Sequence, residues 1–295
     1  MSGEDRQSQL AREHKERQAQ RAEQAPPKTK RNALIGAVVA AVVVVGGLIA
    51  ATTLLGGTDK ADPAAASSPA PSDSALAPLN PTPAPSGSVN PAKVTCSYKK
   101  DTSGSPAKKV GMPPSKPNMK LKTMTITTNH GDVVIDLLTA QSPCAVNSLA
   151  FLASKNFYDN TKCHRLATPE NSGLGLLQCG DPQAKADGKN PTDGQGSSGY
   201  VFDDELSAGV QYVPGVVAMA NGGPNANGSQ FWISLSNETA QLDPVYTPVG
   251  TVAKGMDILD KIFKGGWITN PEDITGDGGS NAPKIPVIIK DLKLS

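Results

Sequence analysis

The sequence has few aromatic residues and few histidines, and it lacks the short motifs by which many enzymes are recognised. Phe, Trp and Tyr make up 4% of its 295 residues, and only three histidines occur. It contains no GxSxG, HExxH or P-loop motif, so serine-nucleophile, zinc-peptidase and nucleotide chemistry have no support. The four cysteines include no CxxC pair, which argues against a zinc site. The formal net charge of +1 gives no case for binding nucleic acid.

Charge is also absent from residues 33–55, an apolar run that follows a strongly charged tail at 1–32. A helix of this length spans the roughly 30 Å hydrocarbon core of a bilayer. A signal-peptide core is shorter, about 7–15 residues, so an uncleaved signal anchor is favoured over a cleaved signal peptide. Lys28, Lys30 and Arg31 flank the run on its N-terminal side. The positive-inside rule therefore predicts a single-pass protein of the cell membrane, with a cytoplasmic N-terminus and an extracytoplasmic remainder.

Proline, alanine and serine dominate the residues that follow the apolar run. Such a composition predicts a semi-extended linker, because proline favours the polyproline II conformation and resists packing. A transitional stretch with more lysine follows from residue 92, and we take 56–118 as linker and transitional segment together. The globular domain is predicted at 119–295.

Short strands alternate with Gly/Pro-rich loops across this domain. Residues 124–138 alternate apolar and polar residues around Gly131 and Asp132, which predicts a β-hairpin. Apolar residues at helical spacing predict one helix at 142–158 and another at 256–263. Further short strands are expected at 163–167, 175–180, 215–220, 230–235, 247–255 and 284–294. Two helices with many antiparallel strands indicate a β-barrel or sandwich with helical caps.

The four cysteines, Cys96, Cys144, Cys163 and Cys179, all lie on the predicted external side of the membrane, where disulfides persist. If the strands at 163–167 and 175–180 pair as a hairpin, Cys163 and Cys179 face each other near its open end. The preferred pairing is therefore Cys163–Cys179 with Cys96–Cys144. Four cysteines allow three pairings, and the sequence alone does not choose among them.

Two long stretches carry a resemblance to a known family: CHRLATPENSGLGLLQCGDP at 163–182 and MANGGPNANGSQFWISL at 219–235. Together they resemble the paired signature of the cyclophilins, most similarly the membrane-anchored bacterial ones, and the likeness extends over about 124–294. It implies a closed eight-stranded antiparallel β-barrel capped by two α-helices. It also implies peptidyl-prolyl cis-trans isomerase activity on proline-containing peptides and unfolded protein clients, without a cofactor or a metal.

The resemblance also implies site residues, position by position. Arg165 falls on the catalytic arginine and Gln178 on the glutamine close to it. A lone arginine on a strand is usually a solvated surface residue, but both residues occur inside the motif pair, which favours the catalytic interpretation. The positions implied to bind substrate are Ala220, Asn221 and Gln230 along the peptide backbone, Leu176, Trp232 and Leu242 as walls of a proline pocket, and Tyr246 at its rim.

Three departures from the family pattern bear on activity. Gly175 stands where a phenylalanine is usual, which is expected to open one side of the proline pocket, with Leu174 and Trp232 as the candidates to fill the gap. Gln241 stands at the tryptophan position that contacts cyclosporin, so weak cyclosporin binding is expected. An insertion at 183–193 lengthens the loop after Asp181. Gly175 favours a second hypothesis, a catalytically weak proline-peptide binding module or chaperone of the cell envelope.

Overall fold

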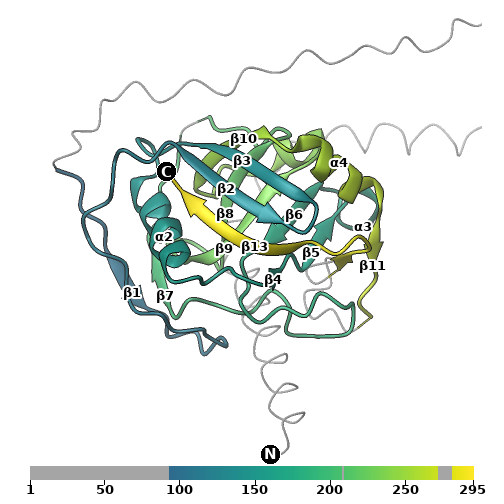
Figure 1. Cartoon of the computed structure of the whole chain (residues 1–295), viewed down its shortest axis with the longest axis horizontal. Helices are drawn as coiled ribbons and strands as arrows, with labels where there is room; N and C mark the ends of the chain where they lie inside the picture. Colours follow the sequence, from purple (N-terminus) through teal and green to yellow (C-terminus); the bar gives the residue numbers. More distant parts are fainter. Residues whose placement is uncertain (1–92, 208, 272–280) are drawn as a thin grey trace, which may run out of the picture. The chain divides into compact units, whose positions relative to one another are not determined.

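A computed structural model of the chain describes residues 93–207, 209–271 and 281–295 (Figure 1). The predicted charged tail, the apolar run at 33–55 and the Pro/Ala/Ser-rich part of the linker lie outside these residues. Within the part of the chain that is described, no helix is long and apolar enough to cross a membrane.

Strands make up most of the described domain, and eleven of them join in one sheet. The predicted mainly-β fold is confirmed, and the strands expected from alternating patterns are present with shifted ends. The strands of this sheet are β1 (Tyr98–Lys100), β2 (Thr123–Thr128), β3 (Gly131–Leu137), β4 (Thr161–Lys162), β5 (Arg165–Ala167), β6 (Leu176–Cys179), β7 (Tyr200–Phe202), β8 (Val216–Asn221), β9 (Asn227–Ser234), β10 (Pro248–Lys254) and β13 (Ile288–Leu294). A separate two-stranded sheet consists of β11 (Trp267–Ile268) and β12 (Ala282–Pro283).

The strand pairings of the described residues do not close into a barrel, and the prediction of a closed eight-stranded barrel is wrong in this respect. The main path runs β1-β7-β9-β8-β10-β3-β2-β13-β4, while β6 pairs with β9 and β5 with β6. β4 and β5 are consecutive in the chain but belong to different ends of the sheet. Between them, Cys163 N donates to Val287 O and His164 N to Gln178 O. Because these neighbouring amides bond to different partners, no single strand joins the two ends.

The predicted hairpin is present as β2 and β3, but its turn lies two residues earlier than the sequence suggests. Thr128 pairs with Gly131, so the turn residues are Asn129 and His130. Thr128 Oγ1 donates to Gly131 O and accepts from His130 N, which closes the turn. Gly131 has φ +123°, a conformation that favours glycine.

Both predicted helices are confirmed, as α2 (Pro143–Ser154) and α4 (Met256–Lys264). A third, short helix, α3 (Pro169–Ser172), and a 3₁₀ helix, η2 (Asn237–Gln241), follow β5 and β9. α2 packs against β9 and β13, and α4 against β3.

The N-terminal end of α2 receives a carboxylate from a distant part of the chain. Pro143 occupies the first turn, where a missing N–H costs nothing. Glu205 accepts hydrogen bonds from the free N–H groups of Cys144 and Ala145. Burial raises the pKa of Glu205 to about 6, and these two hydrogen bonds oppose that rise. The carboxylate thereby satisfies helix amides that the Ser142 side chain leaves unbonded.

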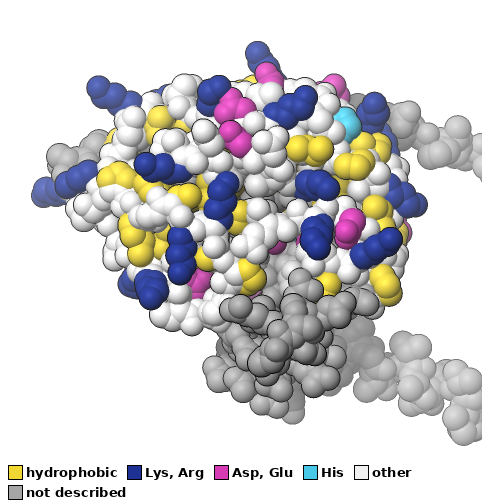
Figure 2. All heavy atoms as spheres, turned by 60° about the horizontal axis from the view of Figure 1, so that its bottom comes forward, with side chains coloured by type: hydrophobic (Ala, Val, Ile, Leu, Met, Phe, Trp, Pro, Cys, Tyr) yellow, Lys and Arg dark blue, Asp and Glu magenta, His cyan; other side chains and the backbone are white. Residues whose placement is uncertain are grey.

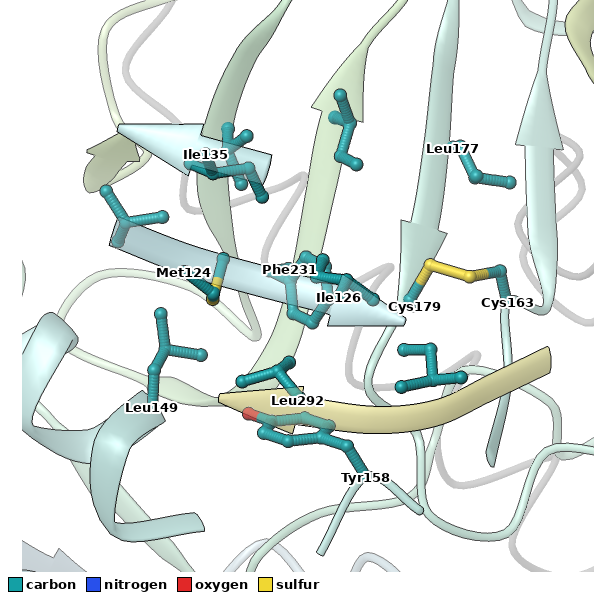
Figure 3. Packing of buried hydrophobic residues seen from close by; sticks show 14 of the residues in the cluster. Met124, Ile126, Ile135, Leu149, Tyr158, Cys163, Leu177, Cys179, Phe231 and Leu292 are labelled. Carbon is teal, nitrogen blue, oxygen red and sulfur yellow. A yellow bond between two sulfur atoms is a disulfide. The ribbon is translucent and has the colours of Figure 1, made fainter. Parts of the chain in front are cut away.

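The core lies on one face of the sheet and follows strand alternation. Leu166, Leu177, Phe231 and Val217 from four neighbouring strands all point into it, with Leu149 of α2. Figure 3 labels Leu149, Leu177 and Phe231 in this core, with Leu177 near the Cys163–Cys179 disulfide. The residues between them in sequence must therefore face the opposite side, which is where the predicted site residues lie.

The segment predicted as transitional packs against the domain. Within 93–118, β1 adds to the edge of the sheet by pairing with β7. Tyr98 packs edge-to-face against Tyr200 and Phe202, and Cys96 forms a disulfide with Cys144. Both preferred disulfide pairings are thus confirmed.

Figure 2 shows one face of the molecule, on which Lys and Arg side chains lie dispersed among uncharged ones. They do not gather into a continuous stripe on this face. A basic stripe of that kind is the usual electrostatic footprint of a nucleic-acid-binding domain.

Candidate active site

Four residues form a row across β5, β6, β9 and β8, on the face of the sheet opposite to the core. Gln178 stands opposite Arg165 on one side and opposite Trp232 on the other. Ala218 continues the row beyond the tryptophan. Directly opposed residues in antiparallel strands have Cβ atoms about 4.5–5.5 Å apart. The register thus places two predicted polar site residues next to the predicted pocket tryptophan.

A chain of hydrogen bonds orients Arg165. Its Nη1 donates to Gln178 Oε1 (3.3 Å), and Gln178 Nε2 donates to Gln230 Oε1 (2.9 Å). Gln230 Nε2 donates to the backbone carbonyls of Gly194 and Gly196, at 2.8 and 2.9 Å. A guanidinium and an amide NH₂ can only donate, and a carbonyl can only accept. Each bond in this chain can therefore have only one direction, with donation running from the arginine through the two glutamines to the backbone carbonyls.

A second apolar cluster, which we call the outer cluster, lies on the same face as this row. Trp232 is 3% exposed and packs edge-to-face against Tyr212 and Tyr246, with ring centroids 5.1 and 5.6 Å apart. The predicted wall and rim residues all belong to this cluster or pack against it. Its members are Ala167, Leu176, Tyr212, Val216, Ala218 and Trp232, with Leu174, Val210, Val213, Ala220, Leu242 and Tyr246 partly exposed around them.

Tyr212 is a site residue that sequence reasoning missed. It precedes β8 in a loop with no periodic pattern, so no sequence signal places it near Trp232. Its hydroxyl donates to Tyr246 O (2.8 Å) and accepts from Tyr246 N (2.9 Å). Burial raises the pKa of Tyr212 to about 12. The neutral hydroxyl therefore holds the backbone of the predicted rim residue in place.

The predicted backbone-binding residues Ala220 and Asn221 end β8 beside the outer cluster. β10 pairs with β8 only as far as Ala218, so both residues lie past that ladder. Both are half-buried. Asn221 Nδ2 donates to Val245 O (3.0 Å), which ties the end of β8 to the segment before Tyr246.

Gly175 does not leave open space in the structure. A Cβ added there would collide with the Ser236 side chain. Gly175 N donates to Thr239 Oγ1, and Thr239 Oγ1 donates back to Gly175 O. The expectation that this glycine opens the proline pocket is therefore wrong, because η2 and the residue before it cover the position. Gln241, which stands at the position of the cyclosporin-contacting tryptophan, donates to Gly173 O (3.0 Å). Weak cyclosporin binding stays a prediction.

The sequence comparison agrees with this arrangement. Residues 123–294 match the family model described as cyclophilin type peptidyl-prolyl cis-trans isomerase, over more than half of the chain. The chain belongs to this family. The resemblance seen in the two motifs is thus confirmed, and the chain is a cyclophilin-type peptidyl-prolyl cis-trans isomerase.

Two mycobacterial cyclophilins are among its relatives, both named probable peptidyl-prolyl cis-trans isomerase B. The Mycobacterium leprae protein is 39% identical over 218 residues, covering 68% of this chain and 67% of the relative. The Mycobacterium tuberculosis protein is 37% identical over 185 residues, covering 58% of this chain and 54% of the relative. A crystal structure of a Cryptosporidium parvum cyclophilin, obtained in the presence of the dipeptide Ala-Pro, is 28% identical, with a TM-score of 0.48 over 59% of this chain and 99% of that one.

A buried histidine precedes the arginine of this cyclophilin. His164 is fully buried, and neither ring nitrogen has a hydrogen-bond partner among the described residues. Burial lowers the pKa of His164 to about 4, against the opposing effect of the Asp193 carboxylate. The imidazole is therefore neutral at ordinary pH and places no second positive charge beside Arg165.

His164 makes the stability of the domain depend on pH. The pKa of His164 is lower in the folded state than in the unfolded state. Its contribution to the free energy of unfolding is therefore present above pH 6.5 and is lost as the pH falls toward 4. A shift of this size corresponds to about 3 kcal/mol. We expect the difference in unfolding free energy between wild type and His164→Gln to shrink by about this amount between pH 7 and pH 4. Urea titrations at each pH measure it, and a difference that does not vary with pH would contradict the prediction.

Among the described residues, no group of three or more His, Cys, Asp or Glu side chains is arranged to hold a metal ion. The chemistry derived for this site uses hydrogen bonds and packing alone.

Proposed function

We propose that this cyclophilin binds proline-containing segments over the outer cluster and uses Arg165 to stabilise the twisted prolyl amide. The observation that carries the proposal is that Arg165 and the outer cluster lie on the same face of the sheet. Gln178 lies on the strand between Arg165 and Trp232 and holds the arginine on the same face, so a proline ring resting on the apolar cluster brings its nitrogen toward the guanidinium.

The chemistry follows from the amide bond. Rotation about an X–Pro bond must break amide resonance, at a cost of about 18–20 kcal/mol. At the twisted transition state the prolyl nitrogen becomes pyramidal and regains a lone pair. A guanidinium N–H can donate to that lone pair, whereas the planar ground state accepts poorly. The interaction is therefore stronger in the transition state, which is the condition for catalysis.

The interactions available at this site can supply the transition-state stabilisation that such catalysis requires. A millionfold acceleration requires about 8 kcal/mol. A charge-assisted hydrogen bond contributes about 1.5–3 kcal/mol. Burial of the proline ring against aromatic side chains, and anchoring of the peptide backbone along the end of β8, supply interactions that can hold the ring while the preceding residue rotates.

Cis/trans exchange of a short X-Pro peptide by NMR tests the proposal. We expect the full chain at substoichiometric concentration to accelerate exchange, and an exchange rate equal to that of the peptide alone would contradict it. Binding is measured in the same samples from Trp232 fluorescence. Trp267→Phe is the matched control variant, because it leaves Trp232 as the only tryptophan and lies in β11, outside the outer cluster.

The same experiment separates the enzyme from the second hypothesis, a proline-peptide binding module or chaperone. A change in Trp232 fluorescence without accelerated exchange would favour that alternative. The covered position of Gly175 removes the sequence feature that had supported it.

We further propose that the domain acts on proteins folding outside the cytoplasm, held at the cell membrane by residues 33–55. The support is the uncharged run with its basic N-terminal flank and the two disulfides, which persist in oxidising compartments. Protease added to intact cells should remove the domain, and protection from it in intact cells but not in lysed ones would contradict this topology.

A further inference from the structure

The loop that follows the catalytic hairpin is built around two buried carboxylates. We call residues 181–196, between β6 and β7, the carboxylate loop. Asp181 is 1% exposed and Asp193 is 3% exposed. Buried aspartates are rare unless their oxygens are hydrogen-bonded, so each of these two should have a structural or functional task.

Asp181 bonds to both ends of this loop. Its Oδ1 accepts from Gln183 N and its Oδ2 from Gly194 N, both at 2.8 Å. A Cβ on Gly196 would collide with Oδ1, so the carboxylate also packs closely against that backbone. Gly194 has φ +87°, a conformation that residues with a side chain rarely adopt. The carboxylate therefore fixes the stretch of backbone whose carbonyls accept from the Gln230 side chain.

Asp193 folds the inserted residues back on themselves. Its Oδ1 accepts from Lys185 N (2.9 Å) and its Oδ2 from Ala186 N (2.7 Å). The insertion is thereby closed into a compact turn between the two carboxylates. Its exposed part includes Asp187, which accepts from the backbone amides of the nearby Lys189 and Asn190.

Gly194 joins the carboxylate to the active site. Its N–H donates to Asp181, and its carbonyl accepts from Gln230, the first side chain of the chain that orients Arg165. A displaced Gly194 carbonyl would remove one of the two acceptors, Gly194 O and Gly196 O, that orient the Gln230 amide. Gln178, whose NH₂ group donates to Gln230 Oε1, would then lose its orientation toward the arginine.

We infer that Asp181 is a positioning residue for prolyl isomerisation, acting through Gly194, Gln230 and Gln178 on Arg165. This inference rests on the proposed role of Arg165. Asp181 acts on the backbone of the carboxylate loop, through its bonds to Gln183 N and Gly194 N. Its task is to keep the backbone acceptors of the carboxylate loop where they set the direction of the hydrogen-bond chain.

Asp181→Asn tests the inference in the full 295-residue chain. One side of the amide would present NH₂ to a backbone N–H, so a buried donor loses its acceptor and the loop shifts. Because small misplacements of a catalytic group lower the rate steeply, we expect kcat for a short X-Pro peptide to fall about tenfold. KM should stay within about twofold, because the outer cluster that binds proline is unchanged. Asp187→Asn, an exposed aspartate of the same loop, is the matched control and should leave both constants at the wild-type value.

A double-mutant cycle separates positioning from general destabilisation. If Asp181 acts through Arg165, then Asp181→Asn should cause no further loss in an Arg165→Ala background. An equal loss in both backgrounds, or a folded Asp181→Asn protein with wild-type kcat, would overturn the inference. An Arg165→Ala protein as active as wild type would instead overturn the proposed mechanism, and this inference with it.

Gly194→Ala keeps the experiment decisive if Asp181→Asn does not fold. Gly194 is half-buried, so a methyl group there mainly forces the backbone away from its positive φ. We expect the same fall in kcat at constant KM. A folded Gly194→Ala protein with unchanged kcat would show that the carboxylate loop does not position the arginine.

Discussion

Replacing Arg165 with alanine should lower kcat/KM for a short X-Pro peptide by about 10²–10³-fold, the usual cost of removing one donor that acts in the transition state. Arg165 holds its guanidinium through Gln178, beside the apolar cluster around Trp232. Alanine removes the donor and leaves that cluster intact. NMR exchange rates measure the loss, and Trp232 fluorescence should report peptide binding close to that of the wild type.

Arg165→Lys is the matched control for this experiment. It keeps the positive charge but lacks the planar set of donors that bonds to Gln178 Oε1 and to a second acceptor at once. We expect an activity between those of wild type and alanine. Full activity in Arg165→Lys would show that charge alone suffices, and full activity in Arg165→Ala would remove the arginine from the mechanism.

Removing the Cys96–Cys144 disulfide should have the largest effect on stability. The bond closes a 48-residue separation, and the loop-entropy relation gives about 4 kcal/mol for a loop of that length. We expect Cys96→Ser combined with Cys144→Ser to lower the free energy of unfolding by about this amount. Denaturant titration measures it. Because the bond lies at α2 and β1, away from Arg165, kcat of the folded fraction should not change.

The second disulfide provides the contrast. Cys163 and Cys179 are 16 residues apart, for which the same relation gives about 3 kcal/mol. They flank the strands that carry Arg165 and Gln178, so their replacement by alanine should lower kcat as well as stability. An unchanged kcat in this variant, or a lowered kcat in the Cys96/Cys144 variant, would contradict the assignment of one bond to the active hairpin and the other to the fold.

Much of the site could be predicted because it lies in two continuous motifs. Strand alternation within 163–182 and 219–235 is enough to put Arg165, Gln178 and Trp232 on one face. Tyr212 could not be found in this way, since it reaches the site from a loop without periodicity. Gly175 misled the prediction for a related reason: its neighbour Ser236 lies 61 positions away, and only tertiary packing brings it close.

The fold was predictable to a similar degree. Alternation and helical spacing locate the strands and both helices, because these patterns report local geometry. Closure of the sheet depends on which carbonyls accept hydrogen bonds from the backbone amides of Cys163 and His164. No local sequence pattern encodes these partners. The packing of β1 against the domain could not be predicted, because a three-residue strand in a Lys/Pro-rich segment has no sequence pattern of its own. Its only sequence signal was Cys96.

The Cys96–Cys144 bond also determines how the domain responds to mechanical load. Tension applied to the chain before residue 93 reaches a covalent cross-link at Cys96 and passes through that bond into α2. Residues 97–143, with β1, β2 and β3, lie inside the closed loop and bear none of the pull along the backbone. A domain pulled from its N-terminal side would thus resist extension through a covalent bond before any β-sheet hydrogen bond of that loop is stretched.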